Sequence, residues 1–113
     1  MNCQERLSLI TKGFQHNRKA FIALGDETRQ LLLLTLLESD LQGIRVGEIA
    51  KKTHLTRPSV SHHLQILKEA GIVRMRKQGT MNFYYISEDE TNWRQLAEFM
   101  TLIYDSISHM KHD

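Results

Sequence analysis

The chain has 113 residues, of which 41% are hydrophobic and 25% charged, and its formal net charge is +2 at neutral pH. This composition is typical of a small globular protein, and it excludes a disordered, highly charged polypeptide. Because the chain contains no apolar run of membrane-spanning length, no signal peptide and only one cysteine, we expect a single domain over residues 1–113, located in the cytoplasm and without an internal disulfide.

Two apolar segments precede the centre of the chain. Leu7, Ile10 and Phe14 recur at helical spacing, which predicts a short amphipathic helix within residues 1–16. The run LLLLTLL at residues 31–37 is far too short to cross a membrane. We expect it to form a buried helix that supplies the core with apolar side chains on every side.

Residues 46–70 have the pattern of a helix, a turn and a second helix. In the second helix Val60, Leu64 and Leu67 fall at spacings of four and three, which places them on one helical face. The preceding helix, expected at residues 46–53, contributes further apolar residues to the same core. One face of the second helix is therefore predicted to be buried and the other to be exposed.

The second helix also carries signals for its two ends. Thr56 is suited to be its N-cap, and Pro58 falls in the first turn, where a missing N–H costs no hydrogen bond. Gly71 is expected to end the helix in the left-handed conformation, with Ile72 folding back on Leu67.

The exposed face of this helix consists of hydrogen-bonding side chains. Gln can pair with adenine edges, Ser with several bases, and Arg with guanine or phosphate, so this face suits the major groove of DNA. His63 lies nearer the buried edge and is expected to pack, whereas His62 is expected to contact DNA. The outward side chains are Arg57, Ser59, Ser61, His62, Gln65 and Lys68.

Positive charge is concentrated in the same part of the chain. Residues 45–77 contain eight Lys and Arg residues and two Glu residues, a net charge of +6 that leaves −4 for the remainder. A basic segment between acidic flanks is typical of a protein that binds a polyanion. A solvated charged face would be the plainer interpretation of the helices alone, and the basic hairpin that follows disfavours it.

Residues 73–86 are predicted to form a β-hairpin, the wing. Apolar and basic residues alternate at its start, Gly79-Thr80 forms the bend, and FYYI is typical of a returning strand. We expect Phe83 and Tyr85 to cover the core. The residues expected at the tip, within reach of a DNA backbone, are Lys77, Gln78, Thr80 and Asn82.

The last predicted helix, over residues 90–110, carries a heptad pattern that follows the acidic residues 88–90. This is the pattern of one helix packed lengthwise against another, and with the first helix it predicts a homodimer. The alternative is that both stripes fold back on the chain's own core. The residues of the stripe are Trp93, Leu96, Met100, Ile103, Ile107 and Met110.

Three stretches together resemble the ArsR-type (ArsR/SmtB) family of bacterial winged-helix repressors: FIALGDETRQLLLLTLL, VSHHLQILKEAGIV and RKQGTMNFYYI, which span most of residues 21–86. The resemblance implies a mainly α-helical winged helix-turn-helix fold with helical termini at a dimer interface. It also implies a homodimer that binds an inverted-repeat operator and represses transcription until an inducer releases it. The DNA contacts that the resemblance carries over are Ser59, Ser61, His62, Gln65, Arg76, Lys77 and Thr80.

These arguments give two sets of candidate residues. The predicted contacts with double-stranded DNA are Thr56, Arg57, Ser59, Ser61, His62, Gln65, Lys68, Arg76, Lys77, Gln78 and Thr80. The predicted dimer interface contains Leu7, Ile10, Phe14, Trp93, Leu96, Met100, Ile103 and Ile107.

No cofactor or metal site is expected. Some relatives sense metals through cysteines in the first helix of the helix-turn-helix, and this chain has none there. Others bind zinc at positions that correspond here to Glu88, Glu90, Thr101 and Tyr104, which include no imidazole. A sensory role for Cys3, or for His109 with His112, stays open, and so does the inducer.

A winged helix could serve as a protein–protein interaction module without binding DNA. An enzyme is not expected, because the sequence contains no Gly-rich phosphate loop and no histidine–carboxylate cluster with zincin spacing.

Overall fold

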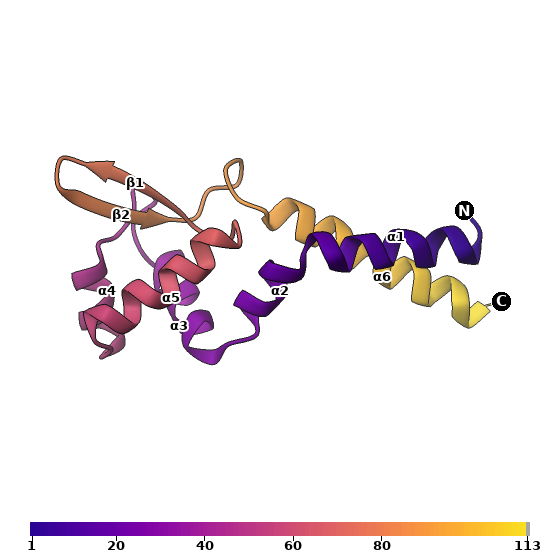
Figure 1. The fold of residues 1–113 in the computed structure, drawn as a ribbon, viewed down its shortest axis with the longest axis horizontal. Coiled ribbons are helices and arrows are strands. Elements are labelled where there is room, and N and C mark those ends of the chain that lie inside the picture. Colours follow the sequence, from indigo (N-terminus) through magenta and orange to yellow (C-terminus); the bar gives the residue numbers. More distant parts are fainter. Residues whose placement is uncertain (113) are drawn as a thin grey trace. The chain divides into compact units, whose positions relative to one another are not determined.

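The computed structural model describes the backbone of residues 1–112 and the side chains of residues 1–110. It is mainly α-helical with one antiparallel hairpin, which confirms the predicted fold class (Figure 1). Its elements are α1 (Cys3–His16), α2 (Arg18–Leu24), α3 (Glu27–Leu37), α4 (Val46–Thr53), α5 (Arg57–Glu69), β1 (Arg74–Gln78), β2 (Met81–Tyr85) and α6 (Trp93–His112). None of the helices in this range is both long and apolar enough to cross a membrane.

The chain divides into two compact units. The central unit comprises Lys19–Thr91, and the terminal unit comprises Met1–Arg18 together with the chain from Asn92 onward. The central unit therefore contains α3, α4, α5 and the hairpin, and the terminal unit contains α1 and α6.

The core of the central unit lies where α3, α4 and α5 meet. Leu32 of α3, Ile49 of α4 and Leu64 of α5 are completely buried there. The α3 helix does not present apolar side chains to the core on every side, contrary to expectation. Leu31, Leu34 and Leu37 are 42%, 55% and 66% exposed, because a helix packed on one side can bury only the residues of that face.

The predicted ends of α5 are confirmed. The hydroxyl of Thr56 accepts a hydrogen bond from the backbone N–H of Ser59 at 3.3 Å, and Pro58 lies in the first turn. At the other end Gly71 has a φ of +76°, and the backbone N–H of Ile72 donates to the carbonyl of Leu67 at 3.0 Å. This is the hydrogen bonding of a Schellman motif, which stops the helix and turns the chain towards β1.

The wing has the expected two-residue bend, with Gln78 opposite Met81 and Gly79 at a φ of +63°. The prediction for its aromatic residues was wrong. Tyr84 is the buried one, at 7% exposure, while Phe83 and Tyr85 are only half-buried. Alternation along β2 explains this, since Tyr84 faces the opposite side of the hairpin from its two neighbours.

Tyr84 also joins the wing to the rest of the central unit. Its backbone N–H and carbonyl each form a 2.9 Å hydrogen bond with Ile44, so that Ile44 forms a short bridge beside β2. Gly43 precedes this bridge at a φ of +110°, and a Cβ there would lie only 3.0 Å from Cβ of Phe83. The loop before α4 can therefore approach the wing closely only because residue 43 is glycine.

In the terminal unit α1 and α6 lie side by side and run in opposite directions (Figure 1). Leu96, Phe99 and Ser106 of α6 are buried, and the rings of Phe14 and Phe99 meet edge to face with centroids 5.0 Å apart. The heptad stripe thus contributes Leu96 to contacts within the chain. The α6 helix begins at Trp93, three residues after the predicted start, because residues 87–91 form a hydrogen-bonded turn instead.

Candidate nucleic-acid interface

The outward face of α5 presents a row of polar side chains. Arg57, Ser61, His62 and Gln65 are exposed, and Ser59 and Lys68 are half-buried. On the opposite face Val60, Leu64 and Leu67 are completely buried. The helix is thus fixed to the core along one side, so that its polar row has a defined direction.

One arginine from another helix holds α5 at its side. Nη1 of Arg29, in α3, lies 3.2 Å from Nδ1 of His63. The same guanidinium donates to the carbonyls of Ala23 and Ile22, at 2.8 and 3.3 Å. His63 is therefore half-buried and engaged, while His62 beside it remains exposed, as the sequence predicted.

The N-cap of α3 completes this arrangement. The Asp26 carboxylate accepts a hydrogen bond from the backbone N–H of Arg29 at 2.9 Å. This hydrogen bond, together with the positive charge of Arg29, holds the pKa of Asp26 below its usual value. Sequence analysis missed Arg29, which lies 34 residues from His63 and has no pattern that marks it.

Two residues of the polar row already have partners. The Gln65 amide donates to the carboxylate of Glu69 at 3.0 Å, one turn further along α5. The guanidinium of Arg57 lies over Gly47 of α4, since a Cβ at Gly47 would be only 2.9 Å from Nη2 of Arg57. Gln65 would have to exchange Glu69 for a base edge in order to read DNA.

The adjacent wing cations Lys77 and Arg76 have different surroundings. Lys77, Gln78 and Thr80 are exposed at the tip, as expected. Arg76 instead donates two hydrogen bonds to the carbonyl of Gln42, at 3.1 and 2.7 Å, and a third to the side chain of Gln78 at 2.9 Å.

Arg76 also contacts the hairpin itself, because its guanidinium carbon lies 4.6 Å from the centre of the Phe83 ring. This is the geometry of a cation–π interaction. The side chain predicted to contact phosphate therefore connects the wing to the loop before α4.

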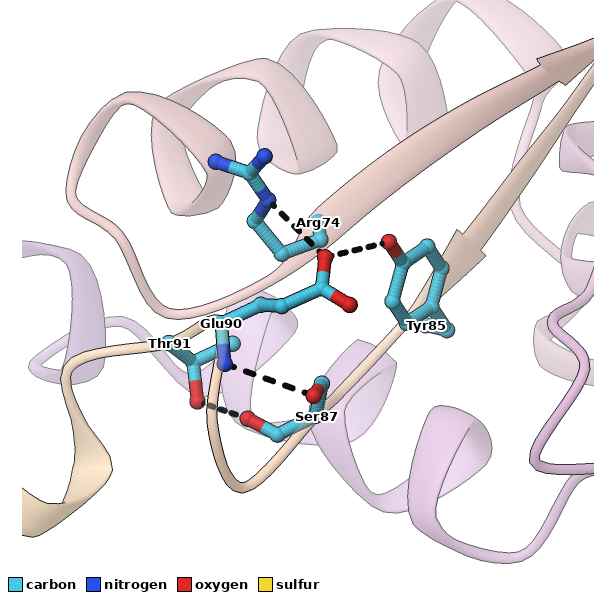
Figure 2. Close-up of polar contacts among 5 residues, drawn as sticks. All are labelled: Arg74, Tyr85, Ser87, Glu90 and Thr91. Carbon is cyan, nitrogen blue, oxygen red and sulfur yellow. Dashed lines mark hydrogen bonds and ion pairs between the residues drawn. The ribbon is translucent and has the colours of Figure 1, made fainter.

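At the base of the wing a second polar cluster connects β1 and β2 to the turn that precedes α6 (Figure 2). Tyr85 donates a hydrogen bond to Glu90 at 2.8 Å, and Nε of Arg74 lies 3.7 Å from the same carboxylate oxygen. The hydrogen bond to Glu90, together with burial, raises the pKa of Tyr85 above its usual value. The turn is closed by a hydrogen bond from the hydroxyl of Thr91 to the carbonyl of Ser87.

The sequence offers several residues as candidates for metal binding or thiol chemistry, among them Glu90, Cys3 and His112. Glu90 is held by Tyr85 and Arg74. Within the described part of the chain no three His, Cys, Asp or Glu side chains are close enough together to hold a metal ion. Cys3 is a free, exposed cysteine, and the side chain of His112 lies outside the described residues.

With this geometry established, comparison with known proteins identifies the family. The family model described as "Bacterial regulatory protein, arsR family" matches residues 26–75. An uncharacterised HTH-type transcriptional regulator of Methanocaldococcus jannaschii, MJ1325, is 43% identical over 76 residues, which cover 67% of this chain and 83% of that protein. The chain belongs to the ArsR family.

Two further proteins to which the chain is similar support its role as a transcriptional regulator and its fold. The transcriptional repressor SdpR of Bacillus subtilis is 34% identical over 77 residues, covering 65% of this chain and 82% of the repressor. The structure of reduced HlyU from Vibrio cholerae superimposes with a TM-score of 0.61 at 26% identity and covers 81% of this chain and 90% of that one. This ArsR-family chain is therefore a DNA-binding transcriptional regulator with a winged helix-turn-helix fold.

Proposed function

We propose that this ArsR-family protein is a dimeric repressor that binds an inverted-repeat operator, with α5 in the major groove and the wing tip beside the DNA backbone. The observation that carries the proposal is the polar row of α5, which is fixed to a buried apolar stripe and flanked by exposed cations. The similarity to the repressor SdpR supports repression. The proposal gives the chain no catalytic role, and its DNA partner accords with a cytoplasmic location.

Within this proposal the polar residues divide into two groups. Ser59, Ser61, His62 and Gln65 would face base edges, because their side chains donate or accept hydrogen bonds without a fixed positive charge. The cationic and tip residues would contact phosphates and supply most of the affinity. These are Arg57, Lys68, Lys77, Gln78 and Thr80, together with Thr56 at the start of α5.

Exposed apolar side chains of the terminal unit support the dimer. Leu7 and Phe14 of α1 are about half exposed, and Met100 and Ile107 of α6 are each 53% exposed. Of the heptad stripe, Leu96 packs within the chain and Trp93 and Ile103 are half-buried, whereas Met100, Ile107 and Met110 remain largely exposed in one copy. Burying such surface against a second copy is favourable at about 25 cal/mol per Å².

Sequencing the genomic fragments that the purified protein retains at moderate salt tests the proposal. We expect enrichment of a few sites with inverted symmetry, which the variants His62→Ala and Gln65→Ala should lose while retaining weak binding to other DNA. Retention of no DNA at all would favour the protein–protein interaction module instead. Enrichment of sites without symmetry would contradict the inverted-repeat operator.

The dimer is tested separately by sedimentation of the variant Ile107→Asp. We expect it to be monomeric and to lose operator binding, since a carboxylate would be placed in the apolar contact between copies. Thr101→Asp, an exposed position on the same helix, is the matched control. An Ile107→Asp protein that stays dimeric would contradict the proposed interface.

A further inference from the structure

We infer that α4 and the first residue of α5 together form a binding site for a DNA backbone phosphate, in which Arg57 of the polar row acts with cations of α4 and which lies apart from the wing tip. The site is a depression lined by Arg45, Gly47, Glu48, Lys51 and Arg57. The inference rests on the proposed DNA binding and deepens it, because it adds a phosphate contact that comes from α4.

Gly47 gives the depression its shape. A Cβ at this position would lie 2.9 Å from Nη2 and 3.2 Å from Cζ of Arg57. The guanidinium therefore rests directly against the backbone of α4, at a distance that any larger residue would prevent. This contact holds Arg57 at the junction of the two helices, so its N–H groups are placed before a ligand arrives.

The charges of the depression favour an anion. Arg45, Lys51 and Arg57 are all exposed, and among the described side chains none of these three cations forms an ion pair. Glu48 is the one acidic residue of the lining, so the lining has a net positive charge. A phosphate diester, which has one negative charge and two unesterified oxygens, fits two arginines and a lysine.

The position of the depression fits a duplex engaged by α5. Arg57 is the first residue of α5 and lies beside the Thr56 N-cap, where the N–H groups of the helix add a partial positive charge. A helix that enters the major groove is flanked by the phosphate backbone. The α4 helix would thereby fix the angle at which α5 enters the groove, without itself distinguishing one base from another.

The test measures binding to a fluorescent mixed-sequence DNA duplex by anisotropy over a series of salt concentrations. Arg45→Gln and Lys51→Gln should each weaken binding by on the order of tenfold and lower the slope of log K against log salt by about 0.9 per bound copy. Lys52→Gln removes an exposed cation of α4 that does not line the depression, and it should change neither quantity.

The variant Gly47→Ala tests the cradle without changing any charge. Its methyl group should displace Arg57 and weaken binding several-fold, while alanine within a helix leaves the unfolding temperature unchanged or higher. Wild-type affinity in Gly47→Ala would overturn the role given to this contact.

The outcomes separate the two proposals. If the wild-type protein binds the duplex and Arg45→Gln and Lys51→Gln behave like Lys52→Gln, the phosphate site is wrong and the proposed function stands. If the wild-type protein fails to bind the duplex even at low salt, the proposed function itself fails.

Discussion

The guanidinium of Arg29 joins three segments of the central unit through one side chain. It lies 3.2 Å from the imidazole of His63 and donates to the backbone carbonyls of Ala23 and Ile22. Arg29 therefore connects the end of α2, the start of α3 and the side of α5. The direction of the polar row on α5 depends on a residue that never faces DNA in the proposed complex.

Replacing Arg29 by Met should lower the free energy of unfolding by about 2 kcal/mol, because it removes a partly buried charged donor together with several of its hydrogen bonds. Urea denaturation followed by circular dichroism measures this change. Arg18→Met, which alters an exposed arginine, is the matched control and should have little effect. Equal stabilities of the two variants would show that the contacts of Arg29 contribute nothing to the fold.

Features that depend on neighbouring residues could be predicted from the sequence, and contacts between residues far apart in the sequence could not. The ends of α5 were predictable because Thr56, Pro58 and Gly71 act on backbone groups within a few residues of themselves. The partner of His63 was not predictable, because it lies 34 residues away in the sequence. Arg76 has the same sequence separation from Gln42, and its contact with that residue was equally hidden.

The inward-facing aromatic residue of the wing was predicted wrongly, although the pairing of the two strands could have been worked out from the sequence. A two-residue bend at Gly79-Thr80 pairs Arg76 with Phe83 and Met75 with Tyr84. Because the apolar Met75 alternates with Arg74 and Arg76, it is expected to face inward, and Tyr84 must then face inward too, since paired residues lie on the same side of a hairpin. Applying the register to the second strand would have identified Tyr84 as the core residue.

Arg76 and Lys77 should have different effects despite being adjacent cations of the wing. Arg76→Ala should lower the free energy of unfolding by about 1–2 kcal/mol, since it loses hydrogen bonds to Gln42 and the ring contact with Phe83. Lys77→Ala should leave stability unchanged and reduce the salt dependence of DNA binding. Thermal unfolding and anisotropy measured on both variants check this, and a destabilised Lys77→Ala would contradict it.

The hydrogen bond from Tyr85 to Glu90 predicts a titration in alkali. Since the pKa of Tyr85 is raised above 10.0, the stability that this bond contributes is present below that pH. It is lost as the pH rises through the folded-state pKa. An ultraviolet absorbance titration should therefore show two tyrosines that ionise later than a free tyrosine, Tyr85 and also Tyr84, whose pKa is raised by burial. In Glu90→Gln only Tyr85 should ionise earlier, and in Asp89→Asn, a change in the same turn, neither tyrosine should.

The contact between Gly13 and Phe99 provides a test of the terminal unit. A Cβ at Gly13 would lie 2.2 Å from Cε1 of the Phe99 ring, which is itself buried between α1 and α6. Alanine favours a helix over glycine by about 1 kcal/mol, whereas overpacking a buried contact costs about 1–3 kcal/mol. The clash at Gly13 is severe, so we expect Gly13→Ala to destabilise the protein.

The control for this change is Ser8→Ala, an exposed position on the same helix, which should be neutral or slightly stabilising. Thermal unfolding followed at the far-ultraviolet helix signal compares the two variants. A second variant, Gly13→Ala with Phe99→Leu, removes part of the ring that the new methyl group would strike. If the clash is the cause, Gly13→Ala should cost less stability in the Phe99→Leu background than alone. An equal cost in both backgrounds would show that α1 and α6 do not pack through this contact.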